Sequence, residues 1–118
     1  MALEHTYTRT VTISTGASAP SNVLDVSDGL PVALIISSTW TASDITFQAS
    51  PIGSSVFHAL TDFAGTVVES TAVVADQWQN LDPDVFAGID RLKVVAGSTQ
   101  AATRTLTLVC LVRSGLGR

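Results

Sequence analysis

Apolar and polar side chains alternate with a period of two along much of this chain, and Val, Ile and Thr are abundant. Such alternation is typical of β-strands that bury one face. The clearest case is residues 6–14, where Tyr7, Arg9, Val11 and Ile13 point to one side. The opposite side carries four threonines: Thr6, Thr8, Thr10 and Thr12. We therefore predict a strand with one threonine-coated, exposed face.

The same reading predicts further strands separated by frequent turn signals. They cover residues 23–26, 32–37, 45–50, 56–60, 66–74, 91–96 and 103–113, with 66–74 supplying one or two strands. A turn at residues 51–54 makes 45–50 and 56–60 a hairpin. One helical turn is expected after residue 81, with Asp82 as its cap, Pro83 at its first position and Gly88 at its end.

About eight strands, one short helical turn and no helical periodicity predict an all-β protein. We expect an antiparallel two-sheet β-sandwich, jelly-roll-like, with a closed barrel as the alternative. The 118 residues are enough for one domain, and no internal repeat or linker divides them. Residues 1–118 are therefore read as a single domain with an N-terminal arm (1–5) and a C-terminal tail (114–118).

Composition makes this sandwich unusual. Charged residues form 14% of the chain, against roughly 25% in soluble proteins, and the mean hydropathy is +0.39. Either a membrane span or a surface covered by other subunits would account for this. The longest nearly apolar run, residues 30–36, contains a proline and falls far short of the roughly twenty residues that a span needs. A covered surface is therefore expected, with no membrane partner, and the N-terminus lacks the features of a secretion signal.

The charges and the single cysteine exclude further classes. The net charge is −4 and the basic residues are scattered along the sequence, which disfavours direct binding to nucleic acid. Cys110 has no partner for an internal disulfide, and its place in the last strand predicts a buried thiol. Stability must then come from packing.

No set of residues predicts catalysis, a cofactor or a metal. The two histidines are His5 in the arm and His58 in a strand, and no nucleophile with a base can be assembled around them. Acidic residues are densest at residues 25–28 and 82–84, but neither segment has the ligand spacing of a calcium loop. We read Asp28 as a turn former and Asp82 as a helix cap.

The two tryptophans leave two interpretations open. Trp40 and Trp78 both lie near predicted loops. They could cover the open ends of the sandwich and bury most of their area, which is the interpretation we favour. As the alternative, they could be exposed and stack on sugar rings. The four phenylalanines are expected in the core or at an interface.

The order of landmarks from residue 32 to residue 113 resembles a known family. Trp40 is followed by ITFQAS, PIGSSVFHAL, DFAGTVV and LDPDVFAGIDRLKVVAG, and then by a loop and RTLTLVCLV. This layout is similar to that of small β-sandwich proteins among the structural proteins of tailed bacteriophages, of the decoration or cement type. The resemblance implies binding to a virion and no substrate turnover.

The expected function is thus that of a non-enzymatic virion structural protein. As a capsid decoration or cement protein it would bind the major capsid protein lattice from the capsid exterior, after assembly in the host cytoplasm. The resemblance favours a homo-oligomer, and a trimer in particular. The expected interface residues are His5, Thr6, Thr8, Thr10, Thr12, Arg113 and Arg118. Two alternatives stay open: a carbohydrate-binding module of a host-recognition spike that uses Trp40 and Trp78, and a head–tail or tail component.

Overall fold

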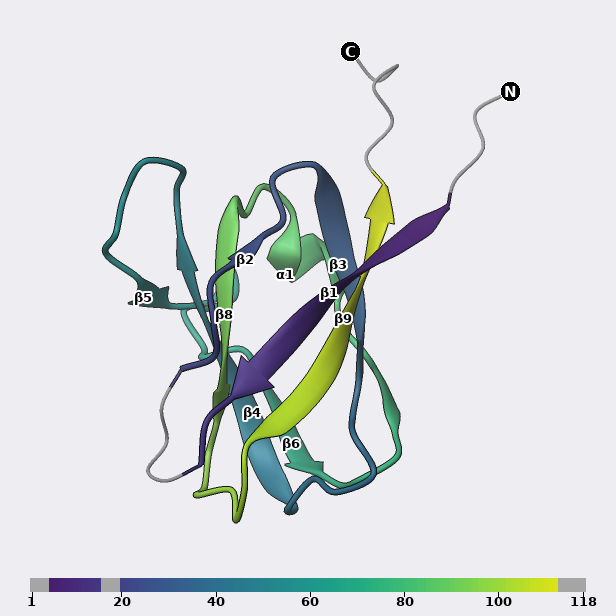
Figure 1. The fold of residues 1–118 in the computed structure, drawn as a ribbon. Coiled ribbons are helices and arrows are strands. Elements are labelled where there is room, and N and C mark those ends of the chain that lie inside the picture. The colour runs from purple at the N-terminus through teal and green to yellow at the C-terminus, as the bar shows by residue number, and fades with distance from the viewer. Residues whose placement is uncertain (1–4, 16–19, 113–118) are drawn as a thin grey trace.

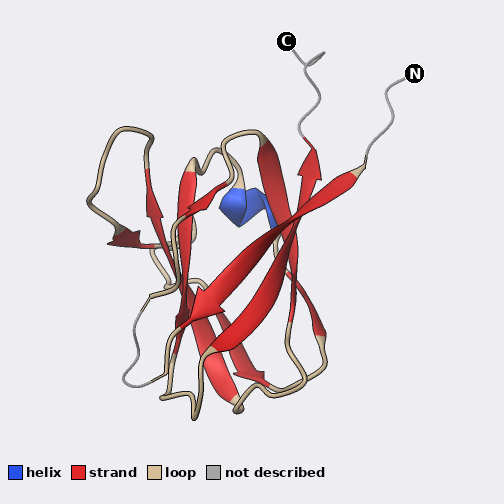
Figure 2. Cartoon of the chain, viewed as in Figure 1, coloured by secondary structure: helices blue, strands red, loops and turns tan. Residues whose placement is uncertain are grey.

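The computed structural model describes residues 5–15 and 20–112, which contain nine strands and one short helix. The strands are β1 (Thr6–Ile13), β2 (Leu24–Asp25), β3 (Gly29–Ile35), β4 (Ser43–Ser50), β5 (His58–Ala59), β6 (Glu69–Val73), β7 (Trp78–Asn80), β8 (Arg91–Ala96) and β9 (Arg104–Val112). The helix α1 spans Pro83–Phe86. Figure 2 shows that strands and loops make up nearly the whole molecule.

The strands form two antiparallel sheets that face each other (Figure 1). The first sheet has the order β1, β9, β3, β7. The second sheet has the order β2, β8, β4, β5, and β6 also pairs with β4. The two sheets stay separate, so the predicted two-sheet sandwich is confirmed and the closed-barrel alternative is wrong.

The strand pairs are nested from the ends of the chain inward. β1 pairs with β9, β2 with β8, β3 with β7 and β4 with β6, all antiparallel. The short β5 is an addition at the centre of this series and pairs only with β4. A chain folded back on itself in this way and then rolled into two sheets is a jelly roll.

The sequence pattern misses one strand and overextends others. β7 is not predicted from the sequence. It covers three residues, which pair with Ala33, Leu34 and Ile35 of β3. The hairpin expected around residues 51–54 does form, but only His58 and Ala59 pair with β4. Such short strands carry too few alternating positions to be recognised in a sequence.

The helical turn is placed as predicted. The Asp82 side chain caps α1 by accepting a hydrogen bond from the Asp84 backbone N–H at 3.0 Å, and Pro83 occupies the first turn. α1 lies at one end of the sandwich between the sheets (Figure 1), where it inserts Phe86 into the core. The Phe86 ring meets the Phe47 ring edge to face, with 5.0 Å between centroids. Such pairs stabilise by about 1 kcal/mol beyond area burial.

The core lies between the inner faces of the two sheets. The first sheet contributes alternate residues of β1 and β9, and the second contributes alternate residues of β4 and β8. These residues are Val11, Ile13, Leu106, Leu108 and Cys110 from the first sheet and Ile45, Phe47, Leu92 and Val94 from the second. Cys110 is a free, fully buried thiol, as the alternation predicts.

Candidate functional site

The outward surface of the first sheet is the strongest candidate for a binding surface, and we call it the threonine face. Its outward-pointing positions follow from the alternation of each strand and the register between strands. They are Thr6, Thr8, Thr10 and Thr12 of β1, Thr105, Thr107, Val109 and Leu111 of β9, Ala33 and Ile35 of β3, and Trp78 and Asn80 of β7. Ala33 and Val109 are buried among their neighbours, and the other positions are exposed or half-buried. None of these described positions carries a charge.

One row of paired residues crosses all four strands of this face. Thr10 is opposite Thr107, Thr107 is opposite Ile35, and Ile35 is opposite Trp78. Ile35 is 36% exposed and Trp78 is 59% exposed, which is unusual for large apolar side chains on a sheet. The row runs from small hydroxyl side chains at β1 to a large aromatic ring at β7.

The outward surface of the second sheet, which we call the charged face, has a different chemistry. Its ionised side chains are Asp25, Asp44, Glu69, Arg91 and Lys93. Asp25 is opposite Arg91 in the register, and the Lys93 ammonium lies 4.3 Å from the centre of the Phe57 ring. The outward face of the second sheet therefore carries charge that the outward face of the first sheet lacks.

The free edge of β1 is closed in part by a side chain. Asn22 accepts a hydrogen bond from the Thr12 N–H at 2.8 Å and donates one from its side-chain amide to the Thr10 carbonyl at 3.2 Å. The Asn22 backbone N–H also donates to the Thr12 carbonyl. These contacts occupy the groups that an added strand would need. A partner would therefore meet the sheet through its face at this point and not through its edge.

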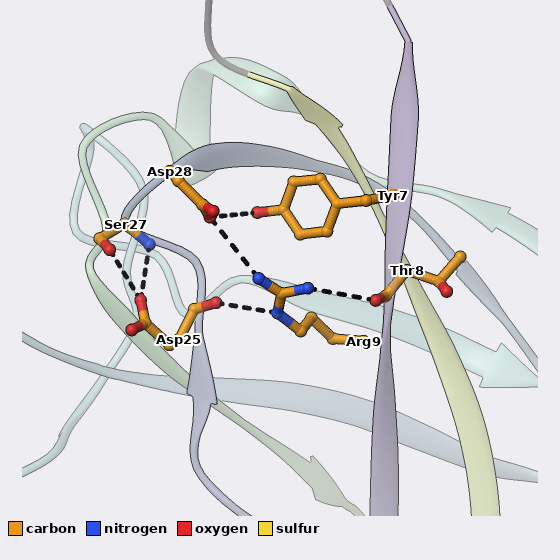
Figure 3. Close-up of polar contacts among 6 residues, drawn as sticks. All are labelled: Tyr7, Thr8, Arg9, Asp25, Ser27 and Asp28. Carbon is orange, nitrogen blue, oxygen red and sulfur yellow. Dashed lines mark hydrogen bonds and ion pairs between the residues drawn. The ribbon is translucent and has the colours of Figure 1, made fainter.

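A polar cluster fastens β1 to the turn between β2 and β3 (Figure 3). The Tyr7 hydroxyl donates to the Asp28 carboxylate at 2.8 Å, and the same oxygen lies 3.7 Å from the Arg9 guanidinium. Arg9 also donates to the Asp25 carbonyl at 3.3 Å and lies over the Tyr7 ring, 4.3 Å from its centre. We call Tyr7, Arg9, Asp25 and Asp28 the Tyr7 cluster. It joins an edge of the first sheet to a strand of the second.

Gly29 is required beneath the Tyr7 ring. A Cβ atom on Gly29 would lie 2.3 Å from the Tyr7 hydroxyl oxygen and 2.7 Å from a ring carbon. Real Cβ atoms do not approach other atoms so closely, so any larger residue must displace the ring. The absence of a side chain at Gly29 thus lets the Tyr7 ring pack directly against the backbone.

The electrostatics of the Tyr7 cluster indicate a structural role. Burial, together with the hydrogen bond to Asp28, raises the pKa of Tyr7 well above its usual range. Hydrogen bonds from the Ser27 backbone and hydroxyl lower the pKa of Asp25. Burial raises the pKa of the Cys110 thiol, which disfavours a nucleophilic thiolate at neutral pH. None of these shifts produces a group poised for proton transfer near pH 7.

The predicted interface residues fall into two sets. Thr6, Thr8, Thr10 and Thr12 are all exposed, as predicted. His5 is exposed too, but its carbonyl accepts a hydrogen bond from the Val112 N–H at 2.9 Å, so it continues the β1–β9 ladder and is not part of a free arm. Arg113, Arg118 and the predicted arm and tail segments 1–4 and 114–118 lie outside the described residues.

The two tryptophans occupy opposite environments. Trp40 is 5% exposed and donates its indole N–H to the Val73 carbonyl, so it is a core residue and cannot stack on a sugar. Trp78 is exposed and donates to the Asn80 side chain. The expectation that both tryptophans would be mostly buried is therefore correct for Trp40 and wrong for Trp78.

Sequence reasoning named only the β1 threonines of the threonine face. It did not assign Thr105, Thr107, Ile35 or Trp78 to the same surface. The alternation in RTLTLVCLV does place Thr105 and Thr107 together on one side of β9. Only the register shows that this side continues the threonines of β1.

The described residues contain no group of three His, Cys, Asp or Glu side chains placed to hold a metal ion. At the two acidic segments, Asp28 accepts the Tyr7 hydroxyl and Asp82 caps α1. In the part of the chain that the structure describes, no helix is long and apolar enough to span a membrane.

Comparisons with known proteins bear on the fold. No protein-family model matches the chain, and no curated protein matches it. Among solved structures it is similar to the SPBc2 prophage-derived protein YomS, with a TM-score of 0.62 and 13% sequence identity. The match covers 94% of this chain and 96% of that one. This chain therefore shares its fold with a prophage-derived protein over nearly the full length of both.

Proposed function

We propose that this protein is a non-enzymatic structural component of a phage particle, of the decoration or cement type. It would bind the major capsid protein lattice on the capsid exterior after assembly in the host cytoplasm. The uncharged threonine face is the observation that carries this proposal. The likeness to a prophage-derived protein supports a phage setting, and the jelly roll is a fold that viral capsid proteins use.

The threonine face suits a permanent contact. Burying apolar area contributes roughly 25 cal/mol per Å² before the costs of association, whereas a buried unpaired charge costs several kcal/mol. A face without charge avoids the second cost over all four strands. Threonine hydroxyls exchange their water for partner hydrogen bonds, and their methyl groups add apolar area.

The remaining expected interface residues extend this surface in our proposal. The Val112 N–H donates a hydrogen bond to the His5 carbonyl, so the first and last described residues lie together at one end of the sandwich (Figure 1). Arg113 and Arg118 follow Val112 in the sequence. We propose that these residues contact the lattice beside the threonine face, and that copies of the chain associate as trimers.

The decisive experiment counts this chain in purified particles of the phage that encodes it. Quantitative mass spectrometry should find a copy number comparable to that of the major capsid protein. A handful of copies, or isolated rings of six or twelve, would instead indicate a head–tail or tail component. Complete absence from particles would exclude a virion role.

Trp78 supports a second candidate function, a carbohydrate-binding module of a host-recognition spike. Its exposed ring is the type of surface on which sugar rings stack. Glycan-array binding that disappears in Trp78→Ala while the thermal unfolding midpoint is unchanged would favour this function. Trp40→Ala cannot serve as this test, because Trp40 is buried and its removal would damage the core.

A further inference from the structure

A second surface with docking chemistry lies on the hairpin that joins β5 to β6. We call residues 61–67 the Phe63 hairpin. Phe63, at its tip, has a relative exposure of 109%, the highest among the exposed large apolar residues of the described chain. A fully hydrated aromatic ring gains more from burial against a partner than almost any other side chain.

The backbone beneath this ring is held in place by hydrogen bonds. Thr61 bridges Val67, and the Asp62 N–H donates to the Thr66 carbonyl at 2.7 Å. The Asp62 carboxylate accepts from the backbone N–H groups of Ala64 and Thr66, both at 2.9 Å. Gly65, with φ +88°, allows the tight turn. Phe63 is therefore presented by an ordered turn, which lowers the entropy cost of binding.

A shallow groove of about 450 Å³ separates this hairpin from helix α1. The hairpin side is formed by residues 61–64, and the α1 side by Asp84 and Val85. The lining thus combines apolar side chains, Phe63 and Val85, with two carboxylates. The Asp62 carboxylate is occupied by the hydrogen bonds that hold the turn. The Asp84 carboxylate has no hydrogen bond or ion pair with another described residue. No basic residue is among the lining residues.

We propose that this groove is a docking site for a protein segment that carries an arginine flanked by apolar residues. The guanidinium would lie against the Phe63 ring, an arrangement favoured by cation–π attraction, and would pair with the Asp84 carboxylate. The flanking apolar side chains would contact Val85 and the rest of the ring. Charge complementarity selects this occupant, because an acidic segment would face Asp84 and a purely apolar one would leave it unpaired.

The site is independent of the threonine face. Its hairpin connects two strands of the second sheet, whereas the threonine face belongs wholly to the first sheet. Both surfaces could be occupied at once, as expected for a protein that links different neighbours. The inference does not rest on the proposed virion role, and either can fail alone.

The test uses the full chain, labelled for NMR, and short synthetic peptides. The probe has a central arginine between leucines, and two control peptides have citrulline or glutamate at the centre. We expect the arginine peptide to shift the amide signals of Phe63, Ala64 and Val85 saturably. The citrulline peptide should bind about two- to fivefold more weakly, and the glutamate peptide should give no saturable shift.

Three variants make the test specific. Phe63→Ala should weaken binding by about tenfold or more, and Asp84→Asn should reduce the preference for arginine over citrulline to the part that the Phe63 ring supplies. Ile52→Ala is the matched control, because Ile52 is also an exposed apolar residue on a turn, 60% exposed, but does not line the groove. Binding to this variant should be unchanged. Thermal unfolding checks that all three variants remain folded.

The proposal is overturned if the arginine peptide gives no saturable shift, or if Phe63→Ala binds it as tightly as the unmodified chain. It is also overturned if these signals shift with protein concentration in the absence of peptide and stop doing so in Phe63→Ala. That result would show that a second copy of the chain fills the groove.

Discussion

The two outer faces of this sandwich are built from strands of the same kind but carry opposite chemistry. The threonine face has no charge at any described outward position of its four strands. The charged face presents Asp25, Asp44, Glu69, Arg91 and Lys93, some of them in cross-strand pairs. Both faces belong to the same sandwich and meet the same solvent.

This difference shows which side of the molecule can be covered at low cost. Charged side chains keep a sheet hydrated and resist burial, because their removal from water costs several kcal/mol each. Threonine suits both the free and the bound state. Its hydroxyl is hydrated in the free protein, and its methyl group adds apolar area in a complex. The uncharged positions are therefore gathered on the face where a partner is expected.

The largest effect should come from placing the same charge on each face in turn. Thr107→Lys inserts an ammonium at the centre of the threonine face, beside Ile35 and Thr10 in the register. We expect its occupancy on phage particles to fall by at least about tenfold, because burying an unpaired charge costs on the order of 3 kcal/mol. Quantitative mass spectrometry of purified particles measures this occupancy.

Thr46→Lys is the matched control for this prediction. Thr46 points outward from β4, in the middle of the charged face and opposite Glu69. Its occupancy should stay close to that of the unmodified chain. Equal losses for both variants would refute the assignment of the threonine face as the docking surface.

The next prediction concerns the connection between the two sheets. Gly29→Ala should lower the free energy of unfolding by about 1–3 kcal/mol, because the new methyl group displaces Tyr7 from Asp28. Urea denaturation measures the change. In a Tyr7→Ala background the same substitution should cost clearly less. An equal cost in both backgrounds would mean that the Tyr7 ring is not what requires glycine here.

The same connection should respond to alkaline pH. The pKa of Tyr7 is raised in the folded chain by burial and by the Asp28 hydrogen bond. The contribution of the neutral Tyr7 side chain to the stability of the fold is therefore fully present below the usual tyrosine pKa near 10. It should be lost as the pH rises above that value. The unfolding midpoint should therefore fall more steeply above about pH 10 in the unmodified chain than in Tyr7→Phe.

The chain has one tyrosine, so its phenolate absorbance gives a direct readout. In the folded chain the absorbance should rise only above the pH at which a free tyrosine ionises. A rise at the usual pH would contradict the assigned environment of Tyr7.

The smallest effect should come from one backbone position in the second sheet that has an unfavourable φ, compared with an alanine of the first sheet that does not. In the second sheet the β4–β6 register shifts, and Ala72 has φ 53°, in the left-handed region that favours glycine. Ala72→Gly should therefore raise the free energy of unfolding by about 0.5–1 kcal/mol. Ala33→Gly, at a strand position of the first sheet that does not have a positive φ, should lower it by at least a similar amount. Urea denaturation of both variants should show these opposite signs, and the same sign for both would refute the difference.

Local chemistry was largely predictable from the sequence. The alternation from Thr6 to Ile13, the Asp82 cap with Pro83 and the buried Cys110 all appear where the pattern places them. These features depend on neighbouring residues in the chain. β7 was not predictable, because three residues carry almost no periodic signal and the strand exists only through its pairing with β3.

The candidate sites depended more on the fold. The exposed threonines of β1 were predicted, but their continuation through Thr107 and Ile35 to Trp78 was not. Trp40 and Trp78 look alike in the sequence, and only packing buries the first and exposes the second. Nothing in the order of residues places Phe63 beside α1.

The sequence by itself determined the class of fold, the faces of its long strands and the low charge, because periodicity and composition act over a few residues. The tertiary structure alone decided which faces became neighbours. The nested pairing brings β9, formed from the last third of the described chain, between β1 and β3. Register between distant strands is set by the packing of the whole core, so only the folded chain joins six threonines, Ile35 and Trp78 into one uncharged surface.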